Sequence, residues 1–157
     1  MNTAPDSLFV RPAERRDLPA VAALFDAYRR FYEQPGDLAL ATAYLNQRFE
    51  RGESVLLVGG RAASGLTGFC QLYPSFCSVL VAPIFTLYDL FVSPEARGTG
   101  LGRALMQAAE AHGREAGAAR LDLSTAHDNH AARALYTAMG WQRDQRFWVY
   151  SKSLTGP

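Results

Sequence analysis

One glycine-rich run limits what this chain can fold into more than any other feature. Arg97-Gly98-Thr99-Gly100-Leu101-Gly102 follows an apolar stretch and opens an alanine-rich helical pattern. Closely spaced glycines let a backbone turn tightly and approach a ligand. The first amides of a helix have no intrahelical partner, and the helix dipole adds partial positive charge there. The run therefore predicts a strand–loop–helix unit with a cradle for phosphate or diphosphate, and a purely structural turn is the alternative.

The spacing of the glycines separates the known cradles. A Walker loop needs a lysine directly after its last glycine, and none follows here. A dinucleotide fingerprint needs G-x-G-x-x-G, whereas Gly98, Gly100 and Gly102 give G-x-G-x-G. The pattern [Q/R]-x-x-G-x-[G/A] is matched in full by Arg97, Gly100 and Gly102. This run resembles the acetyl-CoA pyrophosphate loop of the GNAT superfamily of N-acetyltransferases.

A second segment carries the same resemblance. Residues Asn129 to Trp141 read N-x-x-A-x-x-L-Y-x-x-x-G-[FW], which is similar to the second GNAT signature at every fixed position. The resemblance covers Leu80 to Leu154 and is loosely nearest the polyamine, D-amino-acid and histone-like small-amine branch. It implies an α/β (α+β) fold with a mixed, mostly antiparallel sheet of six to seven strands flanked by about four helices. It also implies an acetyl-CoA-dependent N-acetyltransferase.

Hydrophobic periodicity, together with the positions of glycine, proline and capping residues, predicts where helices and strands begin and end. We expect a single domain over residues 1–157, with residues 1–7 as a loose tail. Helices are expected after Asp17, after Asp37, from Gly100 to about Ala116, and from Asp128 or Asn129 to Gly140. Strands are expected at 8–11, 54–59, 65–73, 79–92 and 119–125, with a loop at 74–78. Two final strands are expected within 141–154, joined near Asp144-Gln145.

Bulk composition excludes several classes of function. A chain of 157 residues with 48% hydrophobic content can build one ordinary core. A net charge of +1 gives no general attraction to nucleic acid or to an anionic membrane. With no long apolar run and no signal-peptide pattern, we expect a cytoplasmic protein. Cys70 and Cys77 form no metal-ligand pattern, so we expect reduced thiols and no metal.

Acyl transfer from a thioester to an amine requires that the long co-substrate be anchored. We expect the loop amides to face the diphosphate, with charge-assisted contacts from the guanidinium groups of Arg97 and Arg103. A solvated helix-surface charge is the alternative for Arg103. The resemblance implies that the pantetheine arm pairs with the backbone of the preceding strand, beside a bulge. The expected cofactor-binding residues in these two segments are Leu90, Phe91, Val92, Arg97, Gly98, Thr99, Gly100, Leu101, Gly102 and Arg103.

Polar assistance is expected from the last helix. Asn129, Ala132 and Tyr136 stand at helical spacing on one face. The resemblance implies that Asn129 hydrogen-bonds the pantetheine arm and that the small Ala132 leaves room for it. It also implies that Tyr136 is the catalytic residue, which gives a proton to the departing CoA thiolate. An ordinary helix cap is the alternative for Asn129, and a packed core tyrosine for Tyr136.

The general base and the acceptor site are less clearly marked. Leu87 to Val92 resembles the L-E-D-[LF]-[FY]-V strand of the small-amine branch, whose proposed glutamate base corresponds to Tyr88. Asp89 is expected on the opposite face, with a structural role as its alternative. Water, His112, His127 and His130 are further alternatives for the base. Phe31 and Tyr32 are expected to line the acceptor site with Tyr88 and Asp89.

The expected acceptor is the primary amine of a small molecule, either an amino acid or a polyamine-like compound. The arginines around Phe31 favour an acceptor with a carboxylate. The alternatives are a protein N-terminus or lysine as acceptor, or a non-catalytic CoA-binding module. A homodimer is also expected, because Phe147, Trp148 and Tyr150 can present an apolar face to a partner, although a buried final strand would explain them as well.

Overall fold

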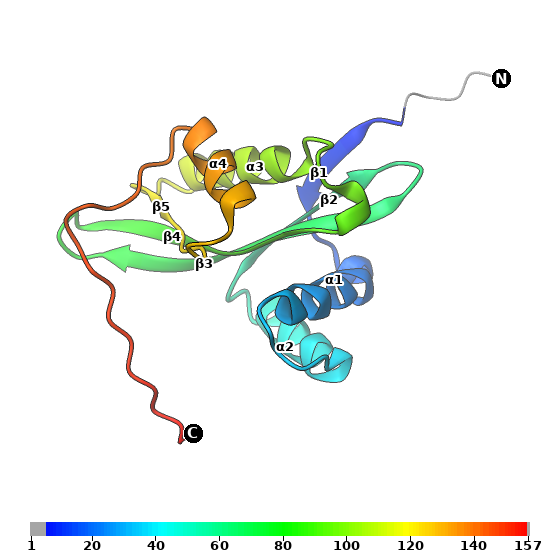
Figure 1. Cartoon of the computed structure of the whole chain (residues 1–157), viewed down its shortest axis with the longest axis horizontal. Helices are drawn as coiled ribbons and strands as arrows, with labels where there is room; N and C mark the ends of the chain where they lie inside the picture. The colour runs from blue at the N-terminus through cyan, green and yellow to red at the C-terminus, as the bar shows by residue number, and fades with distance from the viewer. Residues whose placement is uncertain (1–5, 157) are drawn as a thin grey trace. The chain divides into compact units, whose positions relative to one another are not determined.

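The computed structural model describes residues 6–156, and the chain divides into two units, Met1–Ser124 and Thr125–Pro157. Of the expected tail, residues 1–5 lie outside the described part, and Asp6 and Ser7 have no regular structure. The first unit contains all the strands and three of the α-helices, and the second contains α4 (Figure 1). In chain order the elements are β1 (Leu8–Pro12), η1 (Arg15–Asp17), α1 (Leu18–Phe31), α2 (Leu38–Glu50), β2 (Val55–Arg61), β3 (Gly65–Cys77), β4 (Ala82–Val92), η2 (Pro94–Ala96), α3 (Leu101–Glu115), β5 (Leu121–Asp122) and α4 (His130–Ala138).

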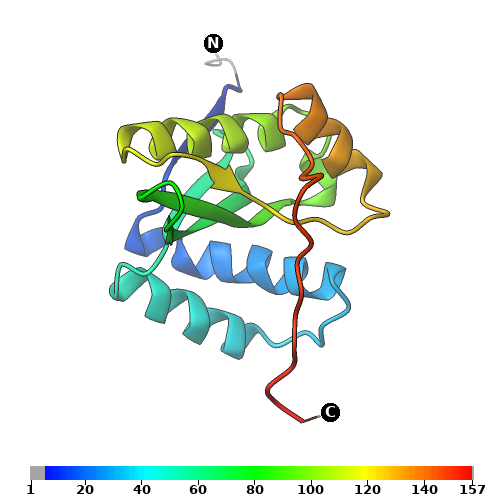
Figure 2. The same ribbon diagram turned by 90° about the vertical axis from the view of Figure 1, so that its left-hand side faces the viewer.

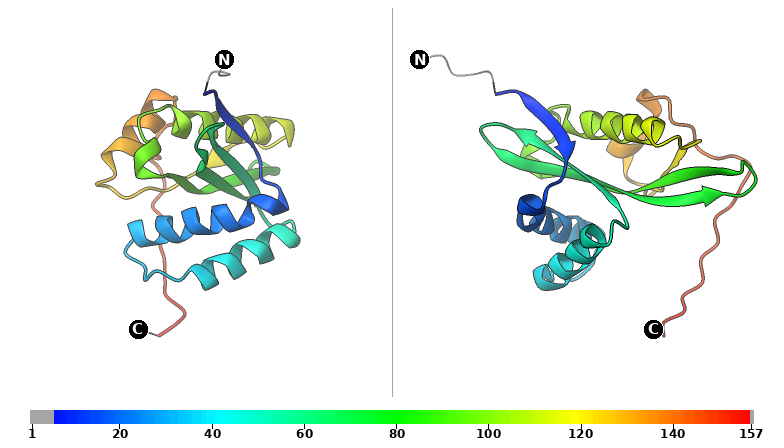
Figure 3. Two further views of the ribbon diagram at one scale, coloured as in Figure 1. Left: turned by 90° about the vertical axis from the view of Figure 1, so that its right-hand side faces the viewer. Right: turned by 180° about the vertical axis from the view of Figure 1, so that it is seen from behind.

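The strands of the first unit form one sheet in the order β1-β2-β3-β4-β5. The first four are antiparallel neighbours, and β5 runs parallel to β4. Helices α1 and α2 cover one face of the sheet and α3 covers the other, as the two side views show (Figures 2 and 3). The expected fold class, a mixed and mostly antiparallel α/β arrangement, is confirmed. The described residues form five strands, fewer than expected.

The helix boundaries follow the local signals of the sequence. Asp37 caps α2 as expected, because its Oδ1 accepts a hydrogen bond of 2.9 Å from the amide of Leu40. Helix α3 begins after Gly100 and ends before Gly117, close to the expected bounds. Within residues 6–156 no helix combines the length and the apolar character that a bilayer crossing requires.

The hydrophobic core between the sheet and the first helix pair is continuous. It consists of the apolar faces of α1 and α2 packed on alternate residues of the three central strands. Its buried members are Leu18, Val21, Ala22, Phe25, Ala41, Leu45, Leu56, Val58, Phe69 and Phe91. This packing fixes α1 against β4, which brings the end of α1 beside the strand expected to bind the cofactor.

Helix α3 packs unusually close to the opposite face of the sheet. A Cβ atom at Gly59 would lie 2.8 Å from Leu101 Cδ1, and one at Gly68 would lie 3.0 Å from Leu101 Cδ2. The Leu101 side chain, 1% exposed, therefore fills the space that these two glycines leave. Since Leu101 is the first residue of α3, this contact fixes where the helix begins.

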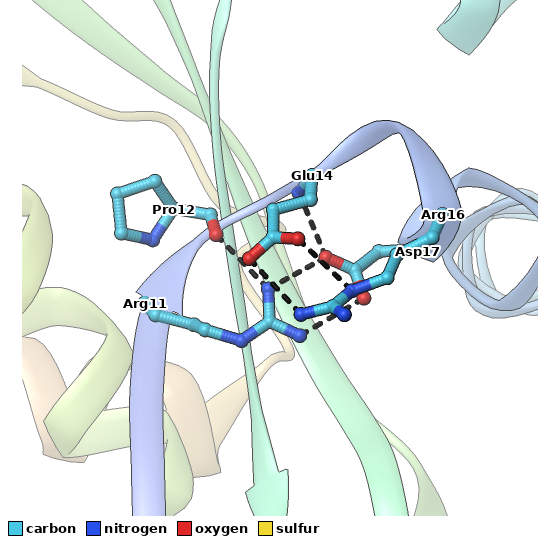
Figure 4. A network of polar contacts seen from close by, with 5 residues as sticks. All are labelled: Arg11, Pro12, Glu14, Arg16 and Asp17. Carbon is cyan, nitrogen blue, oxygen red and sulfur yellow. Dashed lines mark hydrogen bonds and ion pairs between the residues drawn. The ribbon is translucent and has the colours of Figure 1, made fainter.

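An ion pair joins the end of β1 to the start of α1 (Figure 4). Arg11 Nη1 and Nη2 donate to the two carboxylate oxygens of Asp17 at 2.6 and 2.9 Å, and the Glu14 amide donates to Asp17 at 2.7 Å. Asp17 stands at the expected cap position of α1, but its carboxylate is used by Arg11 and Glu14 instead of by the helix amides. Hydrogen bonding from Arg11 lowers the pKa of Asp17 to about 2, although burial opposes the shift.

The structure corrects the expected loop at residues 74–78. Strand β3 continues through Pro74 to Cys77, and only residues 78–81 turn. Pro74 is tolerated because β2 pairs with β3 only as far as Leu72, so the rest of β3 has an open edge on that side. A proline often ends a strand, whereas here it lies on a strand edge.

The two final strands expected within 141–154 are also wrong. An Asx turn does form at Asp144, whose Oδ1 accepts hydrogen bonds from the amides of Arg146 and Phe147, but the residues around it form no strand. Strand β5 comprises only Leu121 and Asp122 of the expected 119–125. An isolated two-stranded hairpin is marginal in water, so a strand-like pattern in the sequence does not by itself produce strands.

The Arg11–Asp17 pair predicts a specific acid sensitivity. A carboxyl whose folded pKa is about 2 and whose ordinary value is 3.8 contributes stability above pH 3.8 and loses it as the pH falls through 2. That contribution amounts to about 2 kcal/mol. We expect Asp17→Asn to lower the free energy of unfolding by about this amount near neutrality and by much less near pH 2, measured by urea denaturation.

The matched control is Glu50→Gln, which changes an exposed carboxylate at the end of α2 whose arginine partner, Arg15, is also exposed. This control substitution should leave the free energy of unfolding nearly unchanged both near neutrality and near pH 2. An Asp17→Asn deficit of the same size at both pH values would contradict this account of the ion pair.

Candidate functional site

The loop before α3 presents a set of unpaired main-chain donors. The first helical hydrogen bond runs from Ala104 N to Gly100 O at 3.0 Å, so the amides of the three preceding residues lie outside the helical ladder. Gly98 and Gly100 have φ of 74° and 88°, which other residues rarely adopt. No atom lies within 4 Å of a Cβ built on either glycine. Among residues 6–156, no backbone acceptor faces the amides of Gly98 to Arg103, which leaves them for an anionic ligand.

Arg97 connects this loop to two other elements. Its Nε donates to the carbonyl of Val92 at 3.1 Å. Its guanidinium carbon lies 5.9 Å from the Phe91 ring centroid and 6.0 Å from that of Phe31. These contacts place the end of β4, the start of the glycine loop and the end of α1 together in the first unit. Two of the predicted cofactor-binding segments and one predicted acceptor residue are therefore neighbours.

The backbone of β4 next to this loop is open along one side. Strand β5 pairs with β4 only at Phe85 and Thr86, so the rest of β4 has no strand beside it on that edge. Ser93 N donates to Thr67 O, and the alternation of an antiparallel ladder then turns the N–H and C=O groups of Leu90 and Val92 away from β3. Phe91 is buried against α1 and pairs with Phe69 of β3. The main-chain groups of Leu90 and the N–H of Val92 are thus available to an extended ligand, while the Val92 carbonyl accepts from Arg97 Nε.

A β-bulge interrupts β4 just before these residues. Gln71 pairs with Asp89 while the next residue of β3, Leu72, pairs with Leu87, so Tyr88 is the extra residue. Tyr88 is 64% exposed and Asp89 is 3% exposed. The Tyr88 ring lies 5.5 Å from that of Tyr73, whose hydroxyl bonds Tyr44 of α2, so Tyr88 lies on the same side of the sheet as Asp89. The expectation of opposite faces is wrong, because the bulge that the resemblance implied interrupts the alternation of the strand.

Asp89 is held by hydrogen bonds in a dry environment. Gln71 Nε2 donates to its Oδ2 at 2.7 Å, and Ser54 Oγ donates to Gln71 Oε1 at 2.8 Å. Burial raises the pKa of Asp89, and hydrogen bonds from Gln71 and Tyr28 oppose this shift without cancelling it. A carboxyl with a raised pKa is better suited to accept a proton near neutrality than an exposed one.

An aromatic cluster extends from Asp89 to the surface. The Tyr28 hydroxyl donates to the Tyr88 carbonyl at 3.2 Å, and the Tyr28 ring lies 5.1 Å from that of Tyr32. Tyr32 in turn lies 5.1 Å from Phe31, and both of these rings are partly exposed. The predicted acceptor residues are thereby brought together in one cluster, with Tyr28 between the buried carboxyl and the solvent.

Arg29, in the last turn of α1, has a buried guanidinium nitrogen without a protein partner. Among residues 6–156 no acceptor faces its Nη1. A buried cationic donor is costly unless it is paired, so this atom is suited to receive an oxygen of an anionic ligand.

In the second unit, the remaining predicted cofactor-binding residues and the predicted catalytic tyrosine lie along one stripe at α4. Asn129, Ala132 and Tyr136 are each partly buried, whereas most residues between them are exposed. Asn129 caps the helix, because its Oδ1 accepts a hydrogen bond of 3.3 Å from Ala132 N. Its amide nitrogen, which the cap does not use, can still donate to a ligand.

The end of α4 fixes the position of the Tyr136 side chain. Trp141 N donates to Tyr136 O and Gly140 N donates to Thr137 O, both at 3.0 Å, and Gly140 has φ of 83°. This pair of bonds is a Schellman motif, and the accompanying apolar contact joins the Tyr136 and Trp141 rings at 6.3 Å. The Y-x-x-x-G-[FW] part of the signature is therefore a helix-ending device that orients the tyrosine.

Several residues of the site were not predicted from the sequence. Gln71 and Ser54 are ordinary strand and loop residues by pattern, and only the cross-strand register of β3 and β4 places Gln71 opposite Asp89. Tyr28 has the spacing of a helix residue that packs on the core, and nothing in that spacing marks its contact with β4. Of the alternative bases, His112 packs against Phe85, and His127 and His130 are exposed. In the described part of the chain, no three metal-ligating side chains gather.

Comparison with known proteins agrees with this geometry. A sequence profile of the acetyltransferase (GNAT) family matches residues 21–141. The chain is 43% identical over 141 residues to an uncharacterized N-acetyltransferase, YhfO, of Bacillus subtilis, covering 90% of this chain and 94% of that one. It is 27% identical over 144 residues to the D-amino-acid N-acetyltransferase HPA3 of Saccharomyces cerevisiae, covering 89% and 88% of the two chains.

A solved structure extends the likeness to three dimensions. The crystal structure of a probable acetyltransferase superposes with a TM-score of 0.88 at 33% identity. The match covers 95% of this chain and 99% of that one.

Proposed function

The chain belongs to the acetyltransferase (GNAT) family, and from this premise we propose that it transfers the acetyl group of acetyl-CoA to the primary amine of a small molecule. The acceptor is an amino acid or a polyamine-like compound. The amine attacks the thioester carbonyl directly, and no metal takes part. The observation that carries the proposal is the row of unpaired amides from Gly98 to Arg103 beside an open β4 edge.

In this proposal the loop amides bind the CoA diphosphate, because they combine hydrogen-bond donors with the positive end of the α3 dipole. Arg103, exposed on the first turn of α3, adds a charge-assisted contact. Leu90 and Val92 offer main-chain groups to the pantetheine arm, and Phe91 contributes to the wall beside it. The free amide nitrogen of Asn129 donates to the same arm, and Ala132 leaves space for it.

Tyr136 is the proposed proton donor to the departing thiolate. A phenol with an ordinary pKa of about 10 is protonated at neutral pH, whereas a free thiolate of similar basicity readily accepts a proton. The Schellman motif and the Trp141 ring hold the Tyr136 side chain in one orientation. Such support for a reacting group is what general acid catalysis requires.

The proposed acceptor carries a carboxylate next to its amine. The unpaired Nη1 of Arg29 provides a buried cationic donor at the end of α1, close in sequence to the predicted acceptor residues Phe31 and Tyr32. A relative of similar length acts on D-amino acids by name. We place the enzyme in the cytoplasm, since Cys70 and Cys77 are both free thiols, as a reducing compartment favours.

The proposed assembly is a homodimer formed through the C-terminal segment, residues 141–156. Phe147, Trp148, Val149 and Tyr150 are 70%, 87%, 92% and 90% exposed. Four successive large apolar side chains rarely remain in solvent in a soluble protein. A second copy that supplies a strand edge to this segment would satisfy its backbone and cover these side chains.

The proton-donor role of Tyr136 predicts a split between binding and turnover. Tyr136→Phe removes only the hydroxyl, so the Kd for CoA in calorimetry should stay within about twofold, while kcat in a thiol-release assay should fall about 10²-fold or more. Tyr150→Phe removes an exposed phenol elsewhere and should change neither. Equal kcat values for wild type and Tyr136→Phe would show that Tyr136 does not donate the proton to the thiolate.

The carboxylate preference predicts a substrate-dependent effect of Arg29. We compare D-phenylalanine with phenethylamine, which lacks only the carboxylate, and include spermidine as a polyamine. Arg29→Gln should raise KM for D-phenylalanine about tenfold or more and leave phenethylamine unaffected, because a charged hydrogen bond is lost only with the first. Arg30→Gln, whose guanidinium pairs with Asp26, is the matched control. Turnover of spermidine alone by the wild type would overturn the proposed amino-acid acceptor.

The dimer proposal predicts the mass in solution. Size-exclusion chromatography with light scattering should give twice the 17.2 kDa of one chain. Replacing Trp148 and Tyr150 together by serine should give a monomer, whereas Lys152→Ser on the same segment should not. A monomeric wild type would contradict the proposal.

A further inference from the structure

The strand that carries the expected base position holds no glutamate there, yet a carboxyl lies next to it in the interior. Tyr88 occupies the bulge and is exposed, while Asp89 points into the layer between the sheet and α1. Buried carboxyls are rare without a cationic partner, and in residues 6–156 no basic side chain forms an ion pair with Asp89. Its role is therefore not explained by charge pairing.

The hydroxyl of Tyr28 is the link between this carboxyl and the surface. It donates to the Tyr88 carbonyl at 3.2 Å and also interacts with the Asp89 carboxylate. Because the bulge removes Tyr88 from the regular ladder, its carbonyl and the Asp89 carboxylate can both face the same hydroxyl. The Tyr28 ring contacts Tyr32, which lines the proposed acceptor site.

The titratable groups that face Asp89 stay protonated and neutral, so the Asp89 carboxyl is the group among them that can take up and release a proton. Burial raises the pKa of Tyr28, of Cys70 and of Tyr73, and the charge of Asp89 adds to each shift. These neighbours therefore remain neutral donors around the carboxylate. Tyr44 and Arg48 of α2 interact with Tyr73 and complete the titratable groups on this side.

We propose that Asp89 is the proton acceptor for the incoming amine and that the Tyr28 hydroxyl carries the proton between them. This rests on the proposed function. An N–H bond of the ammonium form breaks and its proton passes to the Tyr28 oxygen, while the Tyr28 O–H bond breaks and its proton passes to an Asp89 carboxylate oxygen. The freed lone pair of the amine then attacks the thioester carbonyl. As the C–S bond breaks, the sulfur takes the proton of Tyr136, and the second N–H proton, which the adduct gives up as the amide forms, restores the Tyr136 phenol. Afterwards the carboxyl returns its proton through Tyr28 to solvent, so charge and atoms balance.

In this scheme Tyr28 touches the substrate, and Asp89 acts through it as a positioning residue that stores the proton. Gln71 keeps the carboxylate in one orientation through its 2.7 Å hydrogen bond, and Ser54 fixes the Gln71 amide in turn. The chain of contacts explains why a polar glutamine with no exposed surface is retained inside the sheet.

The test is the pH dependence of kcat/KM with acetyl-CoA and, in separate series, D-phenylalanine and spermidine. Asp89→Asn keeps the shape and an acceptor for Gln71 but accepts no proton, so only the neutral amine can react. At neutral pH the kcat/KM of Asp89→Asn should be about 10²-fold below that of the wild type. This deficit should shrink about tenfold for each unit by which the pH rises toward the amine pKa. Tyr28→Phe should give the same profile, and the double variant should be no worse than either single one.

Tyr44→Phe removes a phenol of the same cluster that does not touch Asp89, and it should keep the wild-type profile. A readout without turnover is the ¹³C signal of the Asp89 carboxyl in the free protein. It should titrate above the ordinary 3.8, and Tyr28→Phe should move it higher because a hydrogen bond to the carboxylate is lost.

A deficit of constant size at every pH, in either variant, overturns the relay and leaves the proposed function standing. An Asp89 signal that titrates at or below the ordinary value overturns it as well. A wild type that binds CoA but releases no thiol with either amine defeats the proposed function itself. If Asp89→Asn fails to fold, Tyr28→Phe and the carboxyl titration still decide the matter.

Discussion

The contact between Leu101 and the two glycines beneath it is the constraint on which the remaining site depends. Gly59 and Gly68 leave no side chain on the sheet where α3 begins, and Leu101 fills that space. A Cβ on either strand would push the first turn of α3 outward. Since the free amides of the loop belong to that same turn, this packing and the hydrogen bond from Arg97 to the Val92 carbonyl set their position relative to β4. Burial of an apolar side chain thus orients polar donors.

The bulge in β4 is a second local feature that positions a polar group of the site. One additional residue turns Tyr88 outward and leaves Asp89 inside, where Gln71 and Tyr28 reach it. The arrangement gives the acceptor side of the site a buried carboxyl with a raised pKa, while the cofactor side relies on uncharged amides. In the proposed reaction the two sides have different tasks, since one binds a diphosphate and the other handles a proton.

Much of this could be predicted from sequence because the signals are local. The glycine run, the Asp37 and Asn129 caps and the end of α4 at Gly140 each depend on residues within one turn, and they lie where expected. The features that were missed depend on distant partners. Pro74 lies in a strand because the pairing of β2 with β3 stops at Leu72, and the Tyr28 hydroxyl reaches the Tyr88 carbonyl because α1 crosses the bulge. The final strands were wrong for the same reason, because residues 141–154 have the pattern of strands but form no strand in the structure, and strand formation depends on a partner distant in sequence.

The central claim is that main-chain donors at the start of α3 hold the diphosphate of CoA. Calorimetry with CoA and with pantetheine, which has the same arm but no diphosphate, tests it most directly. The account predicts that CoA binds and that pantetheine binds at least about 100-fold more weakly, because several charge-assisted hydrogen bonds are lost together. Equal affinity for the two compounds would contradict it and would place recognition elsewhere than the loop.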